Sequence, residues 1–149
     1  MKKIVATLVL VSFALTASAQ QKPEDMMKYR KAGLSFMSWN MGRIKANIDG
    51  TYNKDQVVAA ANVVAATANS NLWTLFAAGT ENEIGNEKTR AKPELFQQPD
   101  KVKELAGNLG KEASELAKVA MSGDAAAVKA QFGKTGAACK ACHDQFRKD

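Results

Sequence analysis

Cys139, Cys142 and His143 are the residues of this 149-residue chain whose types and spacing best suit a defined chemistry. Two residues separate the thiols, and the only histidine of the sequence follows the second thiol directly. A helix turns by about 100° per residue, so Cys142 lies about 60° from Cys139 and His143 about 40° away on the other side. The three side chains therefore leave one face, where the C-x-x-C-H pattern predicts covalent attachment of a c-type haem with His143 as iron ligand.

Three other uses of the two cysteines remain as alternatives. A redox-active pair of the thioredoxin kind follows a strand and lies at the start of a helix, which lowers the thiol pKa, whereas these cysteines lie near the end of the chain. A structural zinc site takes four ligands, and this segment supplies three. A plain disulfide suits an exported protein, but it leaves the adjacent His143 without a role.

The start of the chain predicts export. Lys2 and Lys3 precede the apolar residues 4–15, and the small residues 17–19 form a cleavage site, so residues 1–19 are expected to be a signal peptide cleaved after Ala19. The apolar segment is shorter than the ~20 residues of a membrane-spanning helix, which disfavours an uncleaved anchor. Because c-type haem attachment belongs to the oxidising side of a bacterial membrane, we expect a periplasmic protein with one domain, residues 20–149.

The charge of that domain is modest. Removing 19 residues from 149 leaves 130, which hold nineteen Lys and Arg against fifteen Asp and Glu, because Lys2 and Lys3 are lost with the signal peptide. The resulting charge of +4 is too small and too scattered to indicate nucleic-acid binding. We therefore expect no nucleic-acid partner.

Apolar residues recur every three or four positions in four stretches, which predicts four helices and no strand. The first begins at Pro23 and ends at a turn at residues 49–51, and the others are expected over residues 53–79, 99–121 and 124–146. Asn53 with Gln56 forms a capping box, Gly79 stops the second helix and Asp124 caps the fourth. The pattern predicts an all-α fold, an antiparallel up-down four-helix bundle. Its apolar stripes are Met27, Arg30, Leu34, Met37, Met41, Ile44 and Ile48; Val57, Ala61, Val64, Ala68, Leu72 and Leu75; Val102, Leu105, Leu109, Leu116 and Val119; and Val128, Phe132, Cys139, Cys142, His143 and Phe146.

Three departures from a regular bundle bear on a cofactor. Arg30 is charged within an apolar stripe, which suits either an anionic partner such as a haem propionate or a place at the stripe's edge, where the side chain reaches water. Gly133 and Gly136 each cost about 1 kcal/mol relative to alanine within a helix, which suits a flat ring or a closely crossing helix against the backbone. Residues 80–98 are expected to be irregular, with Leu95 and Phe96 docked on the bundle.

The sixth coordination position of the iron stays open on these grounds. A second histidine is excluded, because the sequence has one. Met27, Met37 and Met41 of the first helix are candidate ligands, although methionine more commonly fills gaps in a core. The remaining options are another side chain or no sixth protein ligand.

The sequence resembles the cytochrome c′ family, the four-helix class of c-type cytochromes, over essentially the whole chain after residue 19. The C-x-x-C-H motif is the most specific point of this resemblance, and the order and spacing of further segments add to it. These segments are Lys22-Pro23-Glu24-Asp25, Tyr29-Arg30 with Leu34, Leu72-Trp73 with Phe76, Gly79-Thr80-Glu81, Lys92-Pro93-Glu94-Leu95-Phe96, and Cys139 to Asp144 with Arg147.

The resemblance implies one haem c, attached through Cys139 and Cys142, with His143 as the single axial protein ligand. It also implies that Leu34 covers the opposite, distal face and leaves the iron five-coordinate. A homodimer formed through the first two helices is implied as well. Further cofactor contacts are implied for Arg30 with a propionate, Lys31 at a position where relatives are expected to have a polar contact, Trp73, Glu94, and Arg147 on the proximal side.

A leucine over the iron offers no hydrogen-bond donor, which disfavours bound dioxygen more than nitric oxide or carbon monoxide. We therefore expect a periplasmic monohaem cytochrome that binds these two gases, exchanges electrons with an unknown redox partner and is not an enzyme. Peroxidase chemistry lacks a distal histidine as general base. The alternative is a low-spin, six-coordinate electron-transfer cytochrome with a methionine ligand from the first helix.

Overall fold

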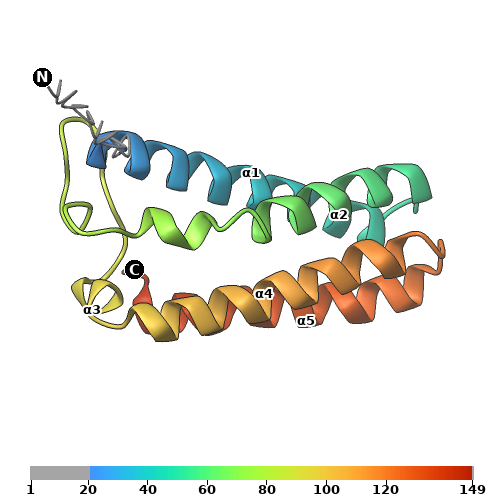
Figure 1. Ribbon diagram of the computed structural model, residues 1–149. Coiled ribbons are helices and arrows are strands. Elements are labelled where there is room, and N and C mark those ends of the chain that lie inside the picture. The colour runs from blue at the N-terminus through green and yellow to red at the C-terminus, as the bar shows by residue number, and fades with distance from the viewer. Residues whose placement is uncertain (1–20, 149) are drawn as a thin grey trace, which may run out of the picture.

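Four long helices make up most of the part of the chain that the structure describes (Figure 1). The computed structural model describes residues 21–148, so the expected signal peptide and its cleavage site lie outside the described residues. The antiparallel pair α1 (Pro23–Asp49) and α2 (Lys54–Ala68) packs through α2 on α4 (Pro99–Ala120), which pairs in turn with α5 (Ala125–Phe146). The prediction of an all-α up-down bundle is confirmed. Within residues 21–148, no helix is both long and apolar enough to cross a membrane.

The helices begin at the residues whose local chemistry predicts a start. Pro23 and Pro99 occupy first-turn positions, where the missing N–H costs nothing. The Asn53 side chain accepts a hydrogen bond from the Gln56 N–H at 3.0 Å, and Asp124 caps α5 in the same way. The other half of the expected capping box does not form, because the Gln56 side chain accepts from Asn47 Nδ2 at 3.3 Å instead.

The second helix is shorter than predicted. It ends at Ala68, and Leu72–Leu75 form a separate 3-10 helix, η1, after Asn71 adopts a left-handed φ of 58°. Asn69 causes the break, since its Nδ2 donates to the Ala65 carbonyl and to Ser114 Oγ of α4 at 3.0 Å. Gly79 has a positive φ of 87°, as a stop residue would, but it lies after η1 and not at the end of α2.

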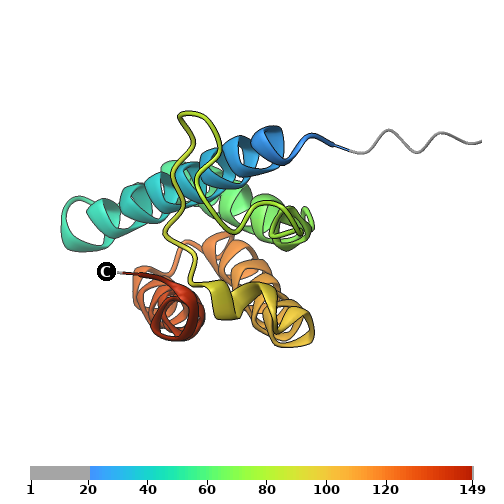
Figure 2. The same cartoon turned by 90° about the vertical axis from the view of Figure 1, so that its left-hand side faces the viewer.

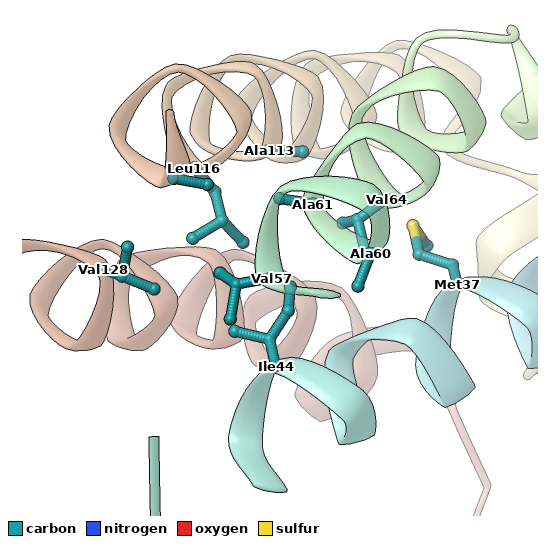
Figure 3. Close-up of a cluster of buried hydrophobic side chains, with 10 residues drawn as sticks. Met37, Ile44, Val57, Ala60, Ala61, Val64, Ala113, Leu116 and Val128 are labelled. Carbon is teal, nitrogen blue, oxygen red and sulfur yellow. The ribbon is translucent and has the colours of Figure 1, made fainter. Parts of the chain in front are cut away.

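The main hydrophobic core lies between all four long helices (Figure 3). Alanines at the contacts between α2 and α4 let these two helices approach closely, and the larger side chains of α1 and α5 fill the remaining space. Met37 is a full member of this core and Met41 packs against it. The buried residues are Met37, Ile44, Val57, Ala60, Ala61, Val64, Ala113, Leu116, Ala120 and Val128.

A second, smaller cluster lies at the end of the bundle where the chain terminates. Part of the connection expected to be irregular forms a short helix, α3 (Pro93–Phe96), and Leu95 and Phe96 dock as predicted. Ahead of it the connection crosses the end of the bundle (Figure 2) and pairs with the end of α5 through Lys92 N to Phe146 O and Lys148 N to Arg90 O, both 2.8 Å. The cluster consists of Ala91, Leu95, Val102, Leu105 and Phe146, with Trp73, Phe76, Phe96, Ala141 and Cys142 against it.

Candidate haem site

The last two turns of α5 hold the cysteine pair. Cys139 and Cys142 are partly buried free thiols, and Cys142 packs against the second cluster. Burial raises the pKa of both thiols above the ordinary value, and the neighbouring Cys139 raises that of Cys142 further. A redox pair of the thioredoxin kind needs the opposite shift. The thiols are therefore protonated near neutral pH. Cys139 and Cys142 are not joined by a disulfide in this structure.

The zinc alternative also lacks support from the geometry. No group of three or more His, Cys, Asp or Glu side chains in residues 21–148 is arranged to hold a metal ion. Cys139, Cys142 and His143 therefore leave one face of α5 without converging on one point. This arrangement suits attachment to a wide, flat group better than ligation of a single ion.

The backbone ahead of Cys139 leaves room for such a group. A Cβ built on Gly133 or Gly136 would meet no atom of another element within 4 Å. No helix within residues 21–148 crosses α5 closely there, so that explanation of the two glycines is wrong. Gly136 lies three residues before Cys139, on the same side of the helix, and the residues present thus fit a covalently held haem.

His143 is exposed, contrary to its expected place in the inward stripe of the fourth helix. Its Nδ1 lies 3.3 Å from Arg147 Nη1, one turn further along. Burial of part of the ring lowers the pKa of His143, and Arg147 and Arg90 lower it further, while Asp144 opposes them. The neutral imidazole, which is the form that binds a metal, is therefore favoured.

A hollow of about 390 Å³ opens beside this imidazole. It lies between the end of α5 and the segment that precedes α3, which the two backbone hydrogen bonds described above hold together. The hollow is lined by Arg90, Lys92, His143, Asp144, Arg147 and Lys148. Sequence reasoning assigned roles only to His143 and Arg147 here. Arg90 and Lys92 come from a connection whose path the sequence does not reveal, and Lys148 follows the end of α5.

Arg30 is 2% exposed, so the alternative in which its side chain reaches water is wrong. Nη1 donates to the Leu75 carbonyl at 3.2 Å and to Thr80 Oγ1 at 2.9 Å, and Nη2 donates to the Thr80 carbonyl at 3.3 Å and to Thr89 Oγ1 at 3.2 Å. The guanidinium carbon also lies 4.4 Å from the centre of the Phe76 ring. Burial lowers the pKa of Arg30, and Glu81 opposes this shift.

These contacts give Arg30 a role that sequence reasoning missed. All four Nη–H donors are used within the protein, and the Nε–H is the donor left for an anionic partner. Thr80, which is fully buried, was recognised only as part of a sequence motif. The sequence signal for this loop contact is the pair Gly79-Thr80. In the structure the glycine has a positive φ of 87° and the threonine side chain is buried.

Leu34 is 37% exposed, although the apolar stripe predicted that it points inward. The residue before it explains the difference. A Cβ on Gly33 would lie 2.9 Å from Leu72 Cδ1, so α1 contacts η1 through its backbone at Gly33 and leaves Leu34 beside that contact.

The other candidate residues lie around the same end of the bundle. Lys31 Nζ pairs with Glu87 at 2.6 Å, and this contact occupies the position where a polar haem contact was expected. Trp73 packs against the second cluster, whereas Glu94 is exposed in the first turn of α3. Met27 is fully buried near the start of α1.

Comparison with known proteins gives matches over most of the chain. The sequence profile described as Cytochrome C′ matches residues 25–147. A cytochrome c′ from Rhodocyclus tenuis is 56% identical over 128 residues, which cover 85% of this chain and 96% of the relative. The crystal structure of cytochrome c′ from Thermochromatium tepidum is 55% identical, with a TM-score of 0.86 over 88% of this chain and 100% of that one.

Related structures include complexes with ligands. A cytochrome c′ with ligand-controlled dimer dissociation is 50% identical, with a TM-score of 0.85 over 88% of this chain and 100% of that one. Cytochrome c′ from Alcaligenes xylosoxidans, 31–32% identical with TM-scores of 0.74–0.75, is known as a nitric oxide complex of a leucine-to-alanine mutant and as a carbon monoxide complex of a leucine-to-glycine variant. These two structures cover 86–87% of this chain and 98% of their own. The sequence match, the fold and the C-terminal cysteine pair agree, and this chain belongs to the cytochrome c′ family of non-enzymatic haem proteins with a covalent haem c.

Proposed function

We propose that the protein is a periplasmic monohaem cytochrome whose haem is bound through Cys139 and Cys142, with His143 as the axial ligand. The spacing of these residues on one face of α5, in a member of the cytochrome c′ family, is the observation that carries the proposal. The bound haem supplies a redox-active iron that binds diatomic gases. The protein determines how open that iron is and what surrounds it.

The hydrogen bond between Arg147 and His143 Nδ1 has to change before His143 can serve as the ligand. Arginine only donates, so the contact with Arg147 makes Nδ1 an acceptor and leaves the ring proton on Nε2. Binding a metal through Nε2 requires the proton to sit on Nδ1, which then donates. Arg147 is therefore expected to release Nδ1 in the haem-bound protein while remaining beside the imidazole as a positive charge.

We infer further that the iron is five-coordinate and binds nitric oxide and carbon monoxide, as related structures do. Two placements support this inference. Met37 and Met41 belong to the main core, whereas Cys142 packs with the second cluster, so both methionines are engaged away from the attachment site. Leu34 is free to cover the distal face and offers no hydrogen-bond donor to dioxygen.

Absorption and electron paramagnetic resonance spectra of the purified ferric and ferrous protein test this proposal. High-spin iron that takes up carbon monoxide is the expected result. Low-spin iron that does not bind carbon monoxide would instead support the electron-transfer cytochrome with a Met27, Met37 or Met41 ligand.

Replacement of Leu34 by alanine is expected to speed the binding of carbon monoxide by about tenfold, because removing a side chain of this size relieves contacts worth about 1–3 kcal/mol. Leu109→Ala, a change of equal size against the main core, serves as the matched control and should leave the rate unchanged. Flash photolysis of the carbon monoxide complexes gives both rates. Equal rates for Leu34→Ala and the parent protein would show that Leu34 does not lie on the distal face.

We also propose a homodimer through the outer face of α1. Phe36 and Trp39 are 52% and 59% exposed and stack with their ring centres 6.0 Å apart, and the Arg43 guanidinium lies 5.0 Å from the Trp39 ring centre. An ordered pair of exposed aromatic rings is typical of an interface. Sedimentation velocity should find a dimer that Trp39→Ala dissociates and that Met121→Ala, a control at another exposed apolar residue, leaves intact.

Export itself is tested at the N-terminus of the mature protein. Mass spectrometry of the periplasmic fraction is expected to find a chain that begins at Gln20 and carries one haem. A chain that retains residues 1–19 would contradict the proposed processing.

A further inference from the structure

The positive charge of the molecule is concentrated beside His143. The hollow there is lined by four cations, Arg90, Lys92, Arg147 and Lys148, and by one acid, Asp144. A fifth cation, Lys140, forms an ion pair with Asp144 at 2.5 Å. We call these five cations the proximal basic surface. The described residues 21–148 hold nineteen Lys and Arg and fourteen Asp and Glu, so removing these five cations and Asp144 leaves fourteen cations and thirteen acids. The rest of the described residues therefore carries a charge of only +1.

Backbone pairing and side-chain contacts bring the cations of this surface together. Arg90 Nε and Nη2 donate to the Lys148 carbonyl at 3.3 and 3.0 Å, across the backbone pairing of the two segments. Asp144 is already paired with Lys140 and neutralises only one charge. A net charge of +4 thus faces solvent around an exposed imidazole.

We propose that the proximal basic surface docks an acidic electron-transfer protein, which exchanges one electron with the haem past the edge of His143. This inference rests on the proposed function, because it takes His143 as the iron ligand. A partner seated on this surface would contact the exposed imidazole of His143, the side chain that would hold the iron. The charge at one end of an otherwise nearly neutral bundle also orients a large charged partner before contact, which a small anion does not require.

Electron-transfer rates of a charge variant and its matched control test the docking. Lys92→Gln with Lys148→Gln removes two cations of the surface whose side chains form no hydrogen bond or ion pair with His143 or Arg147 within residues 21–148. The control, Lys54→Gln with Lys129→Gln, removes the same charge at the opposite end of the bundle, about 27 Å away along α5. The reagents are a reduced plant-type ferredoxin, which is acidic and gives one electron to the ferric protein, and hexaammineruthenium(II), a cationic reductant of small size.

At low ionic strength, the variant should react about tenfold more slowly than the parent with ferredoxin, and the difference should vanish at about 0.5 M salt. Its reaction with hexaammineruthenium(II) should be as fast or faster, and the control should match the parent with ferredoxin. An equal loss in both double variants, or none in either, would overturn the docking surface.

Hexacyanoferrate(III), a small anionic oxidant, separates a protein-docking surface from a site for small anions. The rates with ferredoxin and with hexacyanoferrate(III) should both respond to the charge variant if an acidic protein docks here. A response to hexacyanoferrate(III) alone would overturn the proposal in favour of a small-anion site. A purified protein without covalent haem would instead refute the proposed function, and this is seen in its absorption spectrum before any rate is measured.

Discussion

Replacing Arg30 by methionine is expected to destabilise the protein by about 3 kcal/mol. The guanidinium makes four hydrogen bonds, and a hydrogen bond to a charged group contributes about 1.5–3 kcal/mol net of the exchange with water. The four bonds share one guanidinium and three of them are 3.2–3.3 Å long, so their contributions do not add fully and a loss of about 3 kcal/mol is expected. Methionine retains much of the apolar contact with Phe76, so the lost hydrogen bonds dominate the change.

A double-mutant cycle assigns the effect to particular partners. Thr80→Val removes the hydroxyl that accepts from Arg30 Nη1 and donates to the Ala77 carbonyl, and we expect a coupling of about 1–2 kcal/mol between the two substitutions. Thr74→Val is the matched control, because its hydroxyl bonds to the Asn71 carbonyl and not to Arg30. Its coupling with Arg30→Met should be close to zero.

Guanidinium chloride unfolding of the ferric haem protein, followed by far-ultraviolet circular dichroism, measures all the free energies of this cycle. A coupling between Arg30 and Thr80 below about 0.3 kcal/mol would refute the structural role of the Arg30 guanidinium. If Arg30 acted through a propionate alone, Arg30→Met would alter the haem absorption while Thr80→Val remained independent of it.

Two further predictions concern stability. Tyr52→Phe should stabilise the protein by about 1 kcal/mol, because Tyr52 Oη is buried without a hydrogen-bond partner in residues 21–148. Burial, aided by Asp124, raises the pKa of Tyr52, so the unfolded chain ionises first and the parent should lose stability above about pH 10. Urea titrations at pH 7 and pH 11 measure both effects, and an equal pH dependence in Tyr52→Phe would contradict the second. Gly133→Ala should raise stability by about 1 kcal/mol, whereas Gly136→Ala should not if the haem lies against that turn. Thermal unfolding of the two glycine variants compares them, and equal gains would place the haem elsewhere.

The sequence predicts the starts of the long helices because the signals are local. Pro23, Asn53 and Asp124 act within the first turn of their own helices, and each takes the expected position. The end of α2 is different. Apolar residues continue in register to Leu75, and the break at Asn69 depends on a hydrogen bond to Ser114, 45 residues away. A contact of this range has no counterpart in the local pattern.

In the candidate site, too, the features that depend on nearby residues could be predicted and those that depend on distant residues could not. The common face of Cys139, Cys142 and His143 follows from helix geometry alone, and so it could be predicted. The surroundings of Arg30 could not, because Thr80 and Thr89 lie 50 and 59 residues further along the chain. Asn40 and Asn47 show the same limit, because they are buried on the inner side of α1, where the predicted stripe placed Met41 and Ile48, and those two are only partly buried. Asn47 is buried because it links α1 to the start of α2 through Gln56 Oε1 and the Asn53 N–H.

The division of the apolar interior into two clusters sets an order of assembly for the protein. The main core consists of protein side chains and does not include the cysteine pair, so we expect that part of the bundle to fold without the cofactor. The smaller cluster includes Cys142 and depends on the connection that pairs with the end of α5. Closing it packs Cys142 against protein side chains, so we expect haem attachment to Cys139 and Cys142 to precede the packing of this end. The end of the bundle that holds the cysteine pair is thus the part whose packing depends on the cofactor.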